Sequence, residues 1–134
     1  MKSVSIKRAA ILIMLLIFTA INAQNKSKSL LGKWQGTDER SQGGAIEFLP
    51  DSKAKVMVMG MQIPIDEYKM DDSKDPIQMM LIVKRNGQTM NLYGLIKFID
   101  NDTIKWEVFP MAQQQPIAFS DNAKDTSVVL KRQK

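Results

Sequence analysis

The chain has 134 residues with no cysteine and no histidine, and its 19 Lys and Arg against 14 Asp and Glu give a formal net charge of +5. These absences exclude disulfides and remove the usual general base and the usual activator of a nucleophile, so we expect no enzyme, no cofactor and no bound metal. Three basic residues precede residue 24 and every acid follows it, which leaves 16 basic and 14 acidic residues and a net charge of +2. Because these charges alternate without a basic stripe, we also expect no nucleic-acid binding.

Residues 1–23 have the features of a cleavable secretory signal. A basic start is followed by an uninterrupted apolar run over residues 9–18 and by a small residue, Ala23, at the expected cleavage point. The run is shorter than the roughly 20 residues that a membrane-spanning helix needs, and no cysteine follows it. We therefore expect a secreted or periplasmic protein that is not a cysteine-anchored lipoprotein and keeps no membrane span after cleavage. An uncleaved anchor is the alternative. Residues 24–29 are expected to form a flexible polar leader, and residues 30–134 a single domain.

From residue 30 onward, apolar and polar residues alternate or apolar residues run continuously over short stretches, between turns rich in Gly, Pro, Asn and Asp. This pattern predicts an all-β, antiparallel fold. The eight expected strands cover residues 30–36, 44–50, 53–60, 63–70, 77–84, 89–99, 103–109 and 126–132. We expect them to close into an up-and-down β-barrel, because closure removes exposed strand edges. The interior of an eight-stranded barrel either is filled by side chains or holds one small ligand.

The stretch PDS, residues 50–52, predicts a three-residue hairpin loop with its serine in the left-handed position. This loop would pair Phe48 with Ala54 and Ile46 with Val56, and these side chains would face inward. A two-residue loop is the alternative, and it would shift the pairing by one residue and reverse the faces of the following strand.

Met57, Met59 and Met61 occupy alternate positions in the sequence, so one strand would carry them as a single row on one face. The three-residue loop places this row outside with Lys53 and Lys55, whereas the two-residue loop turns it inward as part of a ligand lining. Thioethers suit Cu(I), but no histidine or cysteine completes a ligand set. We interpret the row as an adaptable apolar surface rather than a metal site.

Several short motifs resemble those of lipocalin-like (calycin-type) barrels. LLGKWQG contains the opening Gly-x-Trp signature at Gly32 and Trp34, and VVLKRQK supplies Arg132, where those barrels bring an arginine over the tryptophan. The middle of the chain is similar to a set of small secreted bacterial lipocalin-like domains that have a Tyr-x-x-Asp strand end and a Lys-x-Pro loop, matched here by Tyr68, Asp71, Lys74 and Pro76. The resemblance spans residues 30–132 and departs at Gln115, where those relatives often have an arginine before the proline. It implies a barrel closed by Gly32, Trp34 and Arg132, with a small hydrophobic molecule as its ligand.

Inward positions on the central strands supply the candidate ligand contacts. These expected contacts are Met79, Leu81, Met90, Leu92, Ile96 and Trp106. Gly94 lies between them and is expected to leave a gap where no side chain projects. Our hypothesis is a secreted lipocalin-like barrel that binds a small hydrophobic ligand. The alternative is a filled barrel that serves as a non-enzymatic structural or protein-interaction module of the cell envelope, with a protein partner that the sequence does not name.

Overall fold

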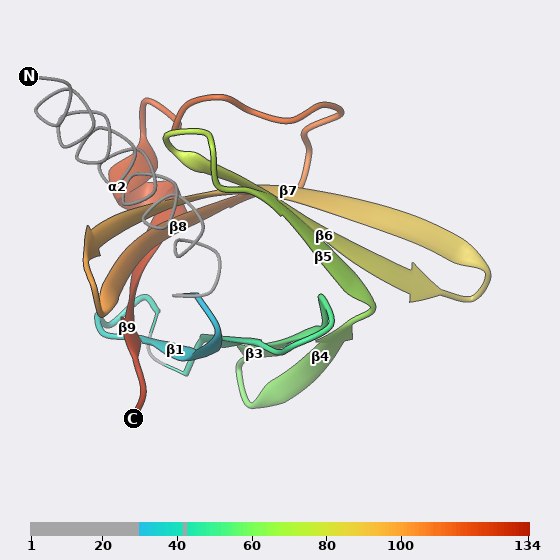
Figure 1. Cartoon of the computed structure of the whole chain (residues 1–134), viewed down its shortest axis with the longest axis horizontal. Coiled ribbons are helices and arrows are strands. Elements are labelled where there is room, and N and C mark those ends of the chain that lie inside the picture. The colour runs from blue at the N-terminus through green and yellow to red at the C-terminus, as the bar shows by residue number, and fades with distance from the viewer. Residues whose placement is uncertain (1–29, 42) are drawn as a thin grey trace, which may run out of the picture.

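The computed structural model describes residues 30–41 and 43–134, and the chain forms a nearly closed, all-β antiparallel barrel (Figure 1). Its nine strands lie in one sheet in the order β4-β3-β2-β1-β9-β8-β7-β6-β5. The strands are β1 (Gly32–Gly36), β2 (Ala45–Phe48), β3 (Ala54–Val58), β4 (Met61–Ile65), β5 (Glu67–Asp71), β6 (Ile77–Arg85), β7 (Gln88–Asp100), β8 (Thr103–Phe109) and β9 (Ser127–Arg132). One helical turn, α2 (Ala123–Thr126), precedes β9.

The predicted signal and leader, residues 1–29, lie outside the described residues. Within the part of the chain that the structure describes, no helix has the length and apolar character needed to cross a bilayer.

β4 and β5 are the two end strands of the sheet. These ends meet because the two strands are consecutive in the chain and only Asp66, at a bend, lies between them. β4 pairs with β3, whereas β5 pairs with β6. Main-chain bonds tie the ends together: the N–H of Asp66 donates to the carbonyl of Ile82 at 3.0 Å, and that of Tyr68 donates to Ser52 at 2.8 Å. The single strand expected over residues 63–70 is therefore divided at the bend, and this gives nine strands where eight were expected.

The side chain of Asp66 strengthens this junction. Its Oδ2 accepts a 2.6 Å hydrogen bond from the Lys84 N–H and lies 3.6 Å from Nη1 of Arg85. The Arg85 guanidinium also donates to the carbonyl of Pro64 at 3.0 Å, which links β6 to β4. The hydrogen bond from Lys84, together with the positive charge of Arg85 nearby, holds the pKa of Asp66 below its ordinary value.

The hairpin between β2 and β3 has the register that the three-residue loop predicts. Ile46 pairs with Val56 and Phe48 pairs with Ala54, and Ser52 has a φ of +61°. This prediction is confirmed. The inner face of β3 packs on the core through Ala54 and Val56.

The expected row of three methionines is wrong, because the chain turns in the middle of it. Met59 and Gly60 have φ values of +50° and +77° and form a two-residue turn, so that Val58 pairs with Met61. Positive φ at both turn residues is what such hairpins require, and the sequence signal for it is usually Asn-Gly rather than Met-Gly. Only Met57 lies on the expected outer side, where it is paired with Gln62 of β4.

One end of the barrel is closed by Trp34, which has no exposed surface. The Arg132 guanidinium lies 4.3 Å from the centre of its ring, and the indole N–H donates to the carbonyl of Leu30 at 2.9 Å. Phe98 meets the indole edge-on, with ring centres 6.2 Å apart. Arg132 Nε also donates a 3.0 Å hydrogen bond to Oδ1 of Asp102. The predicted contact between Trp34 and Arg132 is confirmed.

Gly32 contributes to this end of the barrel through its backbone conformation. Its φ is +114°, a region that side chains with a Cβ rarely adopt. A Cβ built there would meet its nearest neighbour, an Arg132 nitrogen, at an ordinary distance of 3.9 Å. A larger residue is therefore disfavoured by backbone strain.

Candidate functional site

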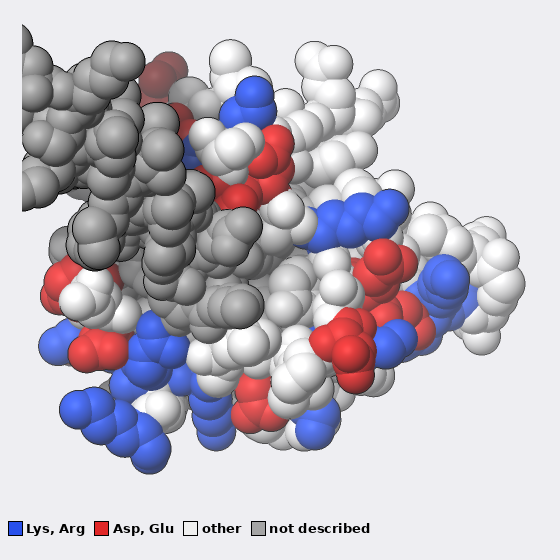
Figure 2. All heavy atoms as spheres, viewed as in Figure 1, with Lys and Arg blue, Asp and Glu red and all other residues white. Residues whose placement is uncertain are grey.

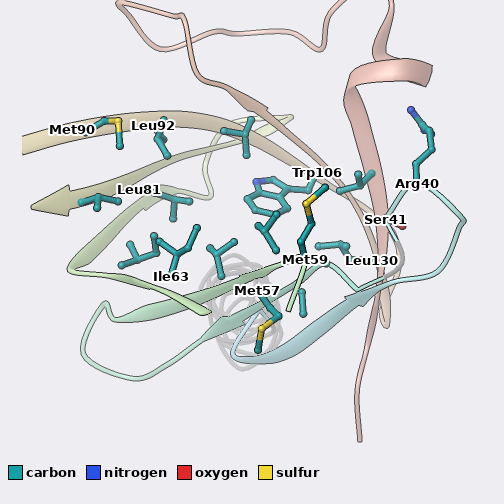
Figure 3. Close-up of a pocket in the computed structure, with 18 of the residues that line it drawn as sticks. Arg40, Ser41, Met57, Met59, Ile63, Leu81, Met90, Leu92, Trp106 and Leu130 are labelled. Atoms are coloured by element: carbon teal, nitrogen blue, oxygen red, sulfur yellow. The ribbon is translucent and has the colours of Figure 1, made fainter. Parts of the chain in front are cut away.

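A cavity of about 650 Å³ occupies the half of the barrel away from Trp34. Period-two alternation directs the inward side chains of six strands to its wall. These residues are Val56, Val58, Ile63, Ile65, Leu81, Val83, Met90, Leu92, Trp106, Val108, Val128 and Leu130. Figure 3 shows them projecting from opposite sides of the barrel into one space. The wall is therefore predominantly apolar.

The six ligand contacts expected from the sequence divide into two groups. Those that line the cavity are Leu81, Met90, Leu92 and Trp106. Met79 and Ile96, which are 1% and 0% exposed, belong to the packed core instead. The expectation that they face the ligand space is wrong, because they point inward but do not line the cavity.

The expected gap at Gly94 is also absent. A Cβ at this position would come within 3.1 Å of Met79 Cε and 3.2 Å of Trp106 Nε1, so both side chains fill the space over the glycine. The absence of a Cβ here lets the indole lie close to β7 and form part of the cavity wall. Trp106 Nε1 is buried and has no hydrogen-bond partner among the described residues.

Sequence reasoning missed much of the wall contributed by the other strands. The predicted loop register placed Val56 inward, and Val58, two residues further along β3, shares its face. Val128 and Leu130 likewise share the face of Arg132 on β9. Period-two alternation could therefore have identified these positions. Ile63 was harder to assign, because its direction depends on the turn at Met59 that the sequence did not reveal.

The mouth of the cavity is apolar and open to solvent. Met59 is 89% exposed, Met90 is 53% exposed and Val58 is 42% exposed, although all three line the cavity. Met57 and Met59 both border the cavity, and in Figure 3 their side chains extend in different directions. The three methionines of the VMVMGMQI stretch thus have different surroundings.

Polar residues border the cavity along the loop between β1 and β2, but they interact with one another. Ser41 donates to Oδ1 of Asp38 from its N–H at 2.8 Å and from its hydroxyl at 2.7 Å. These bonds lower the pKa of Asp38. Arg40 donates to the carbonyl of Ser127 at 3.3 Å, and its side chain extends away from the cavity (Figure 3). Few of the polar groups in this loop are therefore directed toward a ligand in the cavity.

A buried carboxylate lies on the other face of β8, outside the cavity. Burial alone would raise the pKa of Glu107, but hydrogen bonds from Ser120 and Thr126 outweigh it and leave the pKa below its ordinary value. The Ser120 N–H donates at 3.0 Å, and the Ser120 and Thr126 hydroxyls also donate to the carboxylate. Glu107 thus fastens the segment between β8 and β9 to the barrel wall.

On the face of the molecule that Figure 2 shows, basic and acidic side chains are mixed. Residues 30–41 and 43–134 contain no cluster of three or more His, Cys, Asp or Glu side chains placed to hold a metal ion. The predictions about nucleic acid, metal and catalysis stay predictions.

Comparison of the chain with models of protein families, with curated proteins and with solved structures finds no match. The lipocalin-like resemblance of the short motifs therefore stays a prediction.

Proposed function

We propose that this chain is a secreted lipocalin-like barrel that binds a small hydrophobic ligand in the cavity of its open half. The observation that carries the proposal is an apolar space of about 650 Å³ with an exposed mouth. Ligand pockets in proteins commonly measure roughly 300–1,000 Å³ and have mostly apolar walls with few polar groups.

The contrast between the two halves of the barrel supports this proposal over a filled structural module. Around Trp34 and Ile96 the interior is packed without exposed surface. Protein interiors are normally close-packed, and an unfilled apolar space loses dispersion contacts. A molecule that covers this wall gains roughly 25 cal/mol for each Å² of apolar surface removed from water.

The first experiment asks whether the protein carries a ligand from its own host. Protein purified under mild conditions is examined by native mass spectrometry, and an organic extract is examined for small apolar molecules. We expect a bound mass that disappears on extraction. An empty protein that also fails to bind environment-sensitive dyes or long-chain fatty acids at about 10–100 μM would contradict the proposal, because ligands of ordinary affinity would bind at such concentrations.

A pair of neighbouring substitutions on β9 tests whether binding occurs in the cavity. Val128 lines the cavity, whereas the adjacent Val129 lies on the opposite face of the strand. Val128→Trp should fill part of the space and weaken dye binding about tenfold or more, since overfilling a site costs roughly 1–3 kcal/mol. Val129→Trp should bind as the unchanged protein does. Equal loss in both variants would place the site elsewhere.

A further inference from the structure

The methionines of the described chain differ widely in exposure. Met59 and Met90 line the mouth of the cavity at 89% and 53% exposed. Met111 is 92% exposed but does not line the cavity, and Met79 is 1% exposed in the core. Because the chain has no cysteine, its thioethers are its only sulfur groups. Susceptibility of methionine to oxidants depends on this exposure.

We propose that Met59 and Met90 are modification sites at which peroxide oxidises the thioether and thereby weakens apolar ligand binding. This inference rests on the proposed function and adds a form of regulation to the same cavity.

The chemistry is an oxygen transfer with hydrogen peroxide as the oxidant. One peroxide oxygen forms a bond to the methionine sulfur as the O–O bond breaks. The sulfur loses two electrons, and the second oxygen leaves as water with both peroxide protons. The product, methionine sulfoxide, is polar and chiral, whereas the thioether is apolar, and methionine sulfoxide reductases reverse the change.

The position of the two sulfurs gives this change an effect on binding. Met59 comes from the turn between β3 and β4, Met90 comes from β7, and both side chains are directed to the cavity (Figure 3). Met90 pairs with Val83 across the sheet, and Met59 follows Val58, so each methionine lies beside an apolar residue of the cavity wall. A sulfoxide oxygen at this mouth would bind water, and an apolar ligand that covers the mouth would have to displace that water without replacing its hydrogen bonds, which is unfavourable.

The test begins with the purified protein and a neutral fluorescent dye, N-phenylnaphthylamine, as the probe. Peptide mass spectrometry follows oxidation by hydrogen peroxide, and the dye is titrated before oxidation, after it, and after repair by methionine sulfoxide reductases. We expect Met59, Met90 and Met111 to oxidise well before Met79. Dye affinity should fall by about tenfold, the usual order for an unpaired polar group in an apolar site, and should recover on repair. An unchanged circular dichroism spectrum checks that the fold is intact.

Two double variants separate the mouth from other exposed methionines. Met59→Leu with Met90→Leu keeps apolar side chains but removes both sulfurs, so this variant should bind the dye before oxidation and lose its sensitivity to peroxide. The control variant carries Met61→Leu and Met111→Leu, at positions that are 64% and 92% exposed and do not line the cavity. It should remain as sensitive as the unchanged protein.

The outcomes distinguish this inference from the proposed function. If the dye binds before oxidation and binds equally well when Met59 and Met90 are fully oxidised, the oxidation proposal is wrong and the binding proposal stands. The same conclusion follows if the Met59→Leu, Met90→Leu variant loses affinity on oxidation as much as the unchanged protein. If no dye binds before oxidation, both proposals are overturned.

Discussion

The two tryptophans of the chain show how the surroundings of a residue decide its role. Trp34 is fully buried between Phe98 and the Arg132 guanidinium, and its indole N–H is hydrogen-bonded. Trp106 is partly exposed at the cavity wall, and its N–H has no partner among the residues that the structure describes. The first therefore stabilises the closed end of the barrel, and the second shapes the space at the open end.

Replacing each tryptophan by alanine should give unequal losses of stability. Trp34→Ala is expected to lower the free energy of unfolding by roughly 3–5 kcal/mol, because it empties a large, fully packed site. Trp106→Ala, the matched control, should cost clearly less, since its ring already borders open space. Urea denaturation measures both. A loss below about 1 kcal/mol for Trp34→Ala, the size of an ordinary surface change, would show that this side chain does not hold the barrel end.

At the scale of single elements, turns decide which side chains reach the cavity. The serine of PDS and the alternation around it were enough to predict the register of β2 and β3. The Met59–Gly60 turn was missed because methionine seldom occupies a left-handed position. The bend at Asp66 could not be predicted either, since a bend inside a continuous strand leaves the alternation of apolar and polar residues nearly unchanged.

The cavity itself could not be predicted from the sequence. Alternation shows that Met79 and Leu81 both face inward, but only the packing around each side chain shows that Leu81 borders empty space.

The Met59–Gly60 turn should be stabilised by a residue suited to positive φ. Met59→Asn creates Asn-Gly, the favoured pair for such a two-residue hairpin, and is expected to raise the free energy of unfolding by about 1 kcal/mol. Met61→Asn is the control, because Met61 lies in β4, where asparagine is not favoured. Thermal unfolding followed by circular dichroism measures both variants. A lower melting temperature for Met59→Asn would indicate that this turn has a different geometry in solution.

At the scale of the whole molecule, acid stability should depend on Glu107. Its folded-state pKa is lowered, so the stabilisation that it supplies is complete above about pH 4.3, the ordinary pKa of glutamate, and is lost as pH falls through the folded pKa. Glu107→Gln should cost about 1.5–3 kcal/mol at pH 7, the usual range for hydrogen bonds to a charged group. Its unfolding free energy should then decline less steeply in acid than that of the unchanged protein. Parallel declines for the two proteins, measured by urea denaturation from pH 7 to pH 3, would contradict this role.

The bend at Asp66 affects how molecules of this protein associate with one another. If the contacts from Asp66 to Ile82, Lys84 and Arg85 separate, the barrel opens along one line while the β3–β4 and β6–β7 hairpins stay intact. Opening there uncovers two strand edges at once, and an unpaired edge is a template for another chain. Two opened molecules could then exchange this part of the sheet. Self-association should therefore increase with acid, as Asp66 loses its charge, and with protein concentration.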